Sequence, residues 1–232
     1  MTPRRPTSIF ISIVAISLGL LFVSQPVEAQ HRKKVLEEEI VDSTKWFQGL
    51  SVSFDLVGVI QKAVSSYGQY EAALRVNMKD HYFPIVELGV GVANHDEEAT
   101  QVHYETRAPY FRVGIDFNLM KNKHDIYRLY GGARYGFSSF KFDVSHPPVT
   151  DPYWGDEVSF GANDVKCTYH WLEAVFGVDA KIWGPVRLGW SVRYRRRLKC
   201  SVAEMDNCWY VPGYGREDKS NLGGTFNVII EI

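Results

Sequence analysis

Charged side chains that recur on one parity of alternating segments are the largest group of chemically capable residues in this sequence. Between Phe111 and Leu119, for example, Arg112 and Asp116 share a parity and alternate with apolar residues. The whole set holds seven acids and seven bases: Asp55, Glu71, Arg75, Glu87, Arg112, Asp116, Arg128, Arg134, Glu173, Asp179, Lys181, Arg187, Arg193 and Glu231. Its charges cancel, and buried charges must pair. We predict a plug of paired charges; the alternative is a narrow pore for ions or protons.

A second chemically capable group is the basic run YRRRLK at Tyr194–Lys199. The guanidinium group of arginine matches the geometry of phosphate oxygens. The run therefore predicts contacts with lipopolysaccharide phosphates through Arg195, Arg196, Arg197 and Lys199. The alternative is a solvated rim of charged side chains.

Residue types for nucleophilic catalysis are present, but their arrangement in the sequence supports no triad. Such catalysis needs a nucleophile, a base and an orienting group, and Ser139, His170 and Asp179 would have to supply them. The sequence also lacks the Cys and His spacing of zinc sites. We therefore predict no enzyme activity, no catalytic residues, no cofactor and no metal.

The composition indicates a folded protein that does not bind nucleic acid. The 232 residues carry a formal net charge of -1, whereas nucleic-acid binding needs a basic stripe. Charged residues make up 23% and aromatic residues 14% of the sequence. These proportions differ from those of a disordered chain.

Residues 1–29 have the three regions of a secretory signal peptide. Arg4 and Arg5 form a positive region, Ser8–Val23 form an apolar run, and Ala29 is a small residue at the expected cleavage site. The apolar run is shorter than the roughly 20 residues that span a membrane. We therefore expect export with cleavage after Ala29.

Export would place the three cysteines in an oxidising compartment, where disulfides persist. Cys200 and Cys208 are close in sequence, and a disulfide between them would close a local loop. Pairing of Cys167 with either of them stays open. The odd number of cysteines leaves one thiol over.

After a charged stretch at residues 30–48, which predicts a periplasmic linker, residues 49–232 alternate between apolar and polar. Eight segments show the pattern, at Leu50–Leu56, Tyr70–Met78, Val86–Val92, Phe111–Leu119, Tyr127–Phe137, Leu172–Ile182, Val186–Tyr194 and Phe226–Ile232. No segment after the signal peptide shows a helical period. Short and long connections alternate, with the long ones at residues 61–69, 93–109, 138–166 and 196–221. The short ones should therefore share one end of the sheet. Eight such strands close into an up-and-down antiparallel barrel, in which the last strand pairs with the first.

The alternation alone does not decide whether the apolar face lies inside, around a ligand, or outside, against lipid. Glycines such as Gly89, Gly136 and Gly177 sit among the charges, where a narrow eight-stranded lumen needs small residues beside large ones. The apolar positions persist for about 9–11 residues, the length of a tilted membrane strand. Aromatic residues, Tyr82 and Phe83 among them, gather near both strand ends like interfacial girdles. We therefore predict that the apolar face meets lipid.

With its signal peptide, eight alternating segments, unequal loops and final FNVIIEI strand, the sequence resembles the small eight-stranded outer-membrane barrels of Gram-negative bacteria, such as the OmpA membrane domain and OmpX. The resemblance covers nearly all of the mature chain. It implies an all-β transmembrane barrel in the cell outer membrane, inserted by the barrel-assembly machinery, in contact with outer-membrane lipid and lipopolysaccharide, and monomeric. The last strand of such barrels usually ends in an aromatic residue, whereas this one ends in Ile232.

The role that this resemblance implies is structural or interactive: envelope integrity, adhesion, or binding of a surface protein partner through the long loops. Two alternatives come from other classes. One is a soluble periplasmic carrier like a lipocalin, with its apolar face turned inward around a ligand. The other is a lipid-modifying enzyme of the outer membrane.

Overall fold

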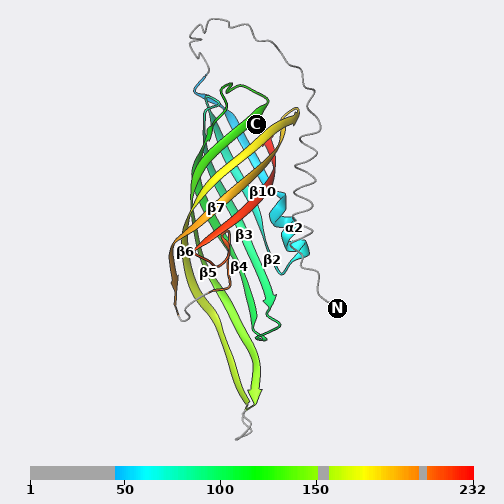
Figure 1. Cartoon of the computed structure of the whole chain (residues 1–232), viewed down its shortest axis with the longest axis vertical. Coiled ribbons are helices and arrows are strands. Elements are labelled where there is room, and N and C mark those ends of the chain that lie inside the picture. Colours follow the sequence, from blue (N-terminus) through cyan, green and yellow to red (C-terminus); the bar gives the residue numbers. More distant parts are fainter. Residues whose placement is uncertain (1–44, 151–156, 204–207) are drawn as a thin grey trace, which may run out of the picture. The chain divides into compact units, whose positions relative to one another are not determined.

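The computed structural model describes residues 45–150, 157–203 and 208–232. The predicted signal peptide and most of the predicted linker lie outside the described residues. The described chain forms a closed antiparallel barrel with the strand order β1-β10-β7-β6-β5-β4-β3-β2 (Figure 1). The barrel strands are β1 (Phe47–Asp55), β2 (Tyr67–Met78), β3 (Tyr82–Asp96), β4 (His103–Asn118), β5 (Tyr127–Thr150), β6 (Glu157–Trp183), β7 (Val186–Val202) and β10 (Ser220–Glu231). The predicted fold class is confirmed.

The strand β10 closes the barrel by pairing with two strands. It pairs with β7 over Ser220–Ile230 and with β1 over Asn227–Glu231. Beyond that register, the amide of Ile232 donates to the carbonyl of Leu50 at 2.7 Å, and the amide of Leu50 donates back at 3.3 Å. The alternation of apolar residues in β10 thus continues a barrel wall without a free edge at this end.

The short connections lie together at one end of the barrel, which we call the turn end, and the long ones lie at the opposite loop end. The sequence predicts loops over residues 93–109 and 138–166, and these predictions are largely wrong. β3 continues to Asp96 before β4 begins at His103, and β5 continues to Thr150 before β6 begins at Glu157. The β5–β6 hairpin projects well beyond the barrel (Figure 1). Alternation continues there because aromatic side chains such as Phe142 are buried on its inner face.

A helix, α2 (Leu56–Val64), follows β1 directly and contradicts the prediction of no helix. Its N-cap is Asp55, whose carboxylate accepts hydrogen bonds from the amides of Val57 at 3.0 Å and Gly58 at 3.2 Å. Asp55 also accepts from the amide of Phe226 in β10, at 3.2 Å. An aspartate in this position satisfies amides that the first helical turn leaves unpaired. Asp55 therefore acts as a helix cap and not as the ion-pair partner that its parity predicts.

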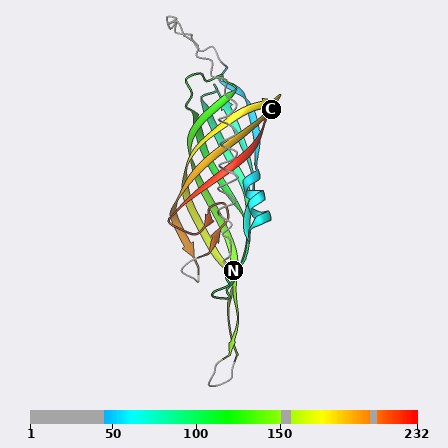
Figure 2. The ribbon, with the colours of Figure 1, turned by 45° about the vertical axis from the view of Figure 1, so that its right-hand side comes forward.

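The helix α2 packs on the outside of the barrel, against β2 and β10 (Figure 2). Gly58 permits this approach, because a Cβ atom there would lie 2.4 Å from the carbonyl oxygen of Gln69. Val59 and Ile60 are exposed on the outer side of the helix. Among the described residues, no helix is long and apolar enough to cross a membrane.

Replacement of Asp55 by alanine is expected to lower the free energy of unfolding by about 1–2 kcal/mol, the usual effect of losing an N-cap. Asp55→Asn keeps an oxygen that can accept the same hydrogen bonds, so its loss should be smaller. Thermal unfolding followed by circular dichroism measures both variants. Equal losses in the two variants would contradict the capping role.

The two faces of the barrel wall carry opposite kinds of side chain. Leu88 and Phe176 point outward and are 59% and 54% exposed, whereas Arg112 points into the lumen and is 0% exposed. Tyr82 lies outward near the turn end, but Phe83 is 2% exposed inside the lumen. The prediction that Phe83 belongs to an interfacial girdle is therefore wrong, because neighbouring residues of a strand face opposite sides.

Candidate functional site

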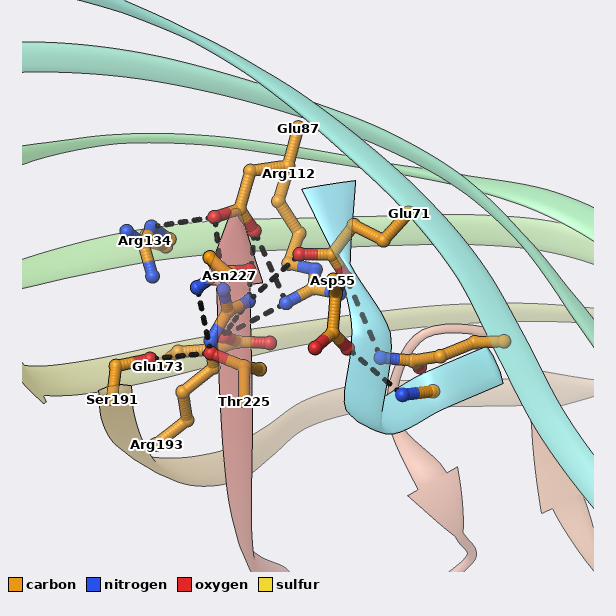
Figure 3. Close-up of polar contacts among 12 residues, drawn as sticks. Asp55, Glu71, Glu87, Arg112, Arg134, Glu173, Ser191, Arg193, Thr225 and Asn227 are labelled. Carbon is orange, nitrogen blue, oxygen red and sulfur yellow. Dashed lines mark hydrogen bonds and ion pairs between the residues drawn. The ribbon is translucent and has the colours of Figure 1, made fainter. Parts of the chain in front are cut away.

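The candidate site is the lumen, and Arg112 of β4 lies at its centre. The guanidinium of Arg112 contacts the carboxylates of Glu71, of Glu87 at 3.1 Å and of Glu173 at 3.3 Å. Arg193 of β7 faces the same three carboxylates at 3.2, 2.9 and 3.7 Å. Figure 3 shows these side chains converging from different strands of the wall. Close pairing of this kind offsets the cost of removing the charges from water.

Ion pairs continue from this centre toward the turn end. Arg134 bridges Glu87, at 3.2 Å, and Asp116, at 3.0 Å. Arg75 then bridges Asp116, at 2.9 Å, and Asp179, at 3.4 Å. The sign of the charge alternates at every step, so each buried guanidinium lies between carboxylates.

The last members of the series lie at the mouth of the turn end. Arg187 contacts Asp179 at 2.6 Å and Glu231 at 3.5 Å. Glu231 also contacts Arg128 at 3.0 Å and Lys181 at 3.6 Å. The structure thus brings together every same-parity charge that the sequence singles out except Asp55. We call these residues, together with Arg195, the lumen ion network.

Arg195 belongs to this network and not to a lipid-facing surface. Its side chain is buried in the lumen, with Nε 3.4 Å from Glu173. Its Nη1 donates to the carbonyl of Tyr214 at 2.9 Å. The prediction that Arg195 contacts lipopolysaccharide is therefore wrong, because its parity in β7 turns it inward.

The other members of the basic run have different surroundings. Arg197 is partly buried and pairs with Glu217. Arg196 and Lys199 are exposed. Of the four basic residues in the run, Arg196 and Lys199 are thus the two that are exposed on the outer side of the barrel. The predicted lipopolysaccharide contact is therefore restricted to these two residues.

Aromatic rings fill the lumen between the charges, opposite glycines. The guanidinium of Arg112 lies 4.8 Å from the ring centre of Tyr110, a cation–π distance. A Cβ atom at Gly89 would lie 2.3 Å from the Tyr110 ring, and one at Gly136 would lie 2.1 Å from the Trp171 ring. Glycine is required at these positions because the large rings take the space of a side chain.

The lumen ion network leaves little free space. A cavity lined by Ser53, Glu71 and Arg193, among others, offers the centre of a water molecule about 10 Å³. That volume holds about one water. The middle of the described barrel is therefore filled by side chains, as expected for eight strands.

The loop end of the lumen is closed by the connection between β7 and β10, which folds into the mouth. Its two-stranded sheet comprises β8 (Tyr210–Val211) and β9 (Gly215–Arg216). The amide of Tyr214 donates to the carbonyl of Val211 at 3.1 Å, and Gly213 has a φ of 81°. This is the pattern of a type II turn with Pro212 and Gly213 at its centre. We call residues 209–214 the aromatic cap.

Hydrogen bonds fasten the aromatic cap to the barrel wall. The hydroxyl of Tyr210 donates to the carbonyl of Gly68 at 3.0 Å, and the hydroxyl of Tyr104 donates to the carbonyl of Tyr210 at 2.8 Å. Tyr210, Val211 and Tyr214 are at most 1% exposed. The sequence predicts only a long connection over this segment. The Pro-Gly turn between the pairs YV and YG is the signal that could have revealed the hairpin.

The residues considered for a catalytic triad do not meet. Ser139 is exposed, and His170 is bonded to the hydroxyl of Tyr135 at 2.5 Å on the outer side. Asp179 lies in the lumen, nine residues further along β6, roughly 30 Å at the usual rise per residue. Within the described residues, no three His, Cys, Asp or Glu side chains are grouped to hold a metal ion.

The fold and the lumen together define a class of protein. A closed antiparallel barrel of eight strands, with charges inside and apolar side chains outside, has the architecture of the small outer-membrane barrels. The chain belongs to the family described as "Domain of unknown function (DUF6048)", whose model matches residues 7–231. No curated protein matches the sequence.

Three solved structures have a chain course similar to that of this protein. Neisserial surface protein A is 11% identical, with a TM-score of 0.44, over 81% of this chain and 100% of its own. Ail, the attachment invasion locus protein of Yersinia pestis, is 12% identical, with a TM-score of 0.39, over 79% and 98%. CarO2 of Acinetobacter baumannii is 13% identical, with a TM-score of 0.40, over 80% and 98%.

Proposed function

We propose that this protein is an integral outer-membrane barrel with a plugged lumen, which acts as a rigid platform for interactions at the cell surface. The observation that carries the proposal is the reversed polarity of the barrel, with charges buried inside and apolar side chains exposed outside. In water such a surface would be unfavourable over so large an area. In a bilayer it is the arrangement that the hydrocarbon core requires.

The outward residues of β6 illustrate the extent of this surface. Thr168 and His170 are polar, and the apolar outward positions run from Leu172 to Ile182. That span matches the 9–11 residues of a tilted membrane strand. We call the outward apolar residues at this level, on all barrel strands, the apolar band.

The filled lumen favours a structural or interactive role over transport. The lumen ion network occupies the middle of the barrel, and the aromatic cap closes the loop end. The β3–β4 and β5–β6 hairpins project beyond the apolar band at the same end. Loops on a rigid scaffold commonly carry binding specificity, so these hairpins are the part that would meet a surface partner.

The two alternative functions have less support in the described residues. A lipocalin-like carrier needs an apolar lumen with room for a ligand, whereas this lumen is charged and filled. A lipid-modifying enzyme needs a nucleophile beside a base, and Ser139 and His170 are not joined to Asp179.

Cell fractionation with surface proteolysis tests the proposed cellular location and membrane topology. We expect the protein in the outer-membrane fraction, soluble only with detergent, and with heat-dependent migration on gels. Protease added to intact cells should cut the projecting hairpins and spare the barrel. Recovery of the native protein in a soluble periplasmic extract would overturn the proposal.

Planar bilayers test the plug. The purified barrel is expected to show no large and stable openings, because side chains fill an eight-stranded lumen. Reconstituted porin in the same bilayer provides the positive control. Stable channels in the unmodified protein would contradict the plug and favour the ion-conducting alternative.

We also propose that Arg196 and Lys199 contact lipid phosphates at the loop-end edge of the apolar band, opposite Leu172 and His170 of β6. Each basic residue near an anionic surface contributes about 1 kcal/mol. Arg196→Gln with Lys199→Gln should therefore weaken binding of purified lipopolysaccharide to the refolded barrel, and Lys121→Gln, at an exposed position of the turn end, should leave it unchanged. Unchanged binding in the double variant would reject these contacts.

A further inference from the structure

The three cysteines meet at the loop end, beside the aromatic cap. Cys167 of β6 and Cys208, which immediately precedes the cap, are 1% and 2% exposed within one buried cluster. Cys200 of β7 packs against the same cluster and is partly buried. Residues far apart in sequence are therefore neighbours here, with Cys167 in contact range of both others.

The strand register separates the two cysteines that lie in the barrel wall. Cys200 is opposite Tyr169, and Cys167 is opposite Val202. The two cysteines are thus diagonal neighbours on adjacent strands, about 7–8 Å apart. A disulfide usually needs Cα atoms 4.4–6.8 Å apart, so the ladder itself disfavours a bond between Cys167 and Cys200.

Cys208 is not held by that ladder, and it is buried in the same cluster as Cys167. The neighbouring thiols, Cys208 more than Cys200, lower the pKa of Cys167 below its ordinary value. Burial raises the pKa of Cys200 to about 11. Because the thiolate is the attacking form, Cys167 is the nucleophile of the group and Cys208 its principal partner.

We propose that Cys167 and Cys208 form a disulfide that fastens the aromatic cap to β6, and that Cys200 stays a free thiol. This inference rests on the proposed function only in requiring export to an oxidising compartment. The sequence leaves Cys200–Cys208 and a bond of Cys167 with either cysteine open, and the fold favours Cys167–Cys208 because these two share a buried cluster.

The oxidant is a disulfide-carrying thiol oxidoreductase of the oxidising compartment to which the chain is exported. The Cys167 thiolate attacks one sulfur of the oxidant's disulfide, which forms a mixed disulfide and releases one oxidant thiolate. Cys208, as a thiolate, then attacks the Cys167 sulfur and displaces the second oxidant thiolate. The cysteine pair loses two protons and two electrons, and the oxidant becomes a dithiol.

Mass spectrometry of the full chain, isolated from membranes and unfolded in the presence of an alkylating reagent, tests the bond. After proteolysis without reduction, we expect a peptide containing Cys167 linked to one containing Cys208, and Cys200 in alkylated form. Cys200→Ser should keep this linkage, and Cys208→Ser should abolish it. A Cys200–Cys208 linkage, or three alkylated thiols in the exported protein, would overturn the proposal.

A second measurement tests the assigned cysteine pair independently of the proposed outer-membrane location. The chain is refolded in detergent in the presence of glutathione disulfide and analysed in the same way. A Cys167–Cys208 linkage there supports the assigned geometry even if fractionation places the protein outside the outer membrane. Formation of a Cys200–Cys208 disulfide instead would reject the assigned pair, wherever in the cell the protein is located.

Discussion

Replacing Arg112 with methionine is expected to lower the free energy of unfolding by about 3–5 kcal/mol. Loss of one partner from a buried ion pair leaves the other charge uncompensated, and that penalty has this size. Arg112 is 0% exposed and faces Glu71, Glu87 and Glu173. Thermal unfolding in detergent, followed by circular dichroism and gel migration, measures the change.

Two further variants make this prediction specific to the lumen ion network. Arg196→Met removes an exposed arginine from β7 and should change stability by less than about 0.5 kcal/mol. Glu173→Gln in the Arg112→Met background removes one carboxylate that has lost an arginine partner, so part of the lost stability should return. An Arg112 variant as stable as the Arg196 control would show that the network does not hold the barrel together.

Coupling with Arg193 follows from the shared partners. Arg193 contacts the same three carboxylates as Arg112. Residues of one network have non-additive effects on stability. A double-mutant cycle on the two arginines should therefore depart from the sum of the single variants by more than about 0.5 kcal/mol.

Replacing Phe176 with arginine is expected to cost about 2–4 kcal/mol in assembly, the cost of a lipid-facing arginine at the midplane of a membrane barrel. Phe176 lies in the middle of the apolar band on β6 and is 54% exposed. In a water-soluble barrel, the same change at so exposed a site would be nearly neutral. The variant thus distinguishes a lipid-facing wall from a solvated one.

Thr168→Arg provides the matched control, because Thr168 has the same outward parity on β6 but lies beyond the apolar band. Folding yield in lipid vesicles, measured by heat-dependent gel migration, compares the two variants. We expect a clear loss for Phe176→Arg and near wild-type folding for Thr168→Arg. Equal yields would reject the bilayer as the surroundings of the apolar band.

The sequence predicts the strands well because their signal is local. A period of two places Arg112 and Asp116 on one face and Val113 on the other, whatever the rest of the chain does. The same rule, applied strictly, places Arg195 inside. The lipid contact predicted for Arg195 follows from the basic run around it and not from that parity. The girdle position predicted for Phe83 likewise follows from its aromatic type and not from its place in the alternation.

The sequence does not predict helix α2, because the helix has only 9 residues and its clearest sequence signal is a single N-cap residue, Asp55. Asp55 fits the alternating pattern of β1. The sequence alone therefore does not show whether its carboxylate pairs with a charge in the lumen or caps a helix. The carboxylate of Asp55 also accepts a hydrogen bond from the amide of Phe226 in β10. Phe226 lies near the other end of the chain. Only the closed barrel brings that amide to the start of the helix.

By itself, the sequence determined the eight alternating strands, which residues of a strand share a face, and the balance of charge on the polar face. Local alternation and composition are sufficient for these features. The tertiary structure alone decided which acid meets which arginine, how the aromatic cap enters the mouth, and why Cys167 lies beside Cys208. These contacts depend on strand register and barrel closure, and both are set by pairing between residues far apart in the chain.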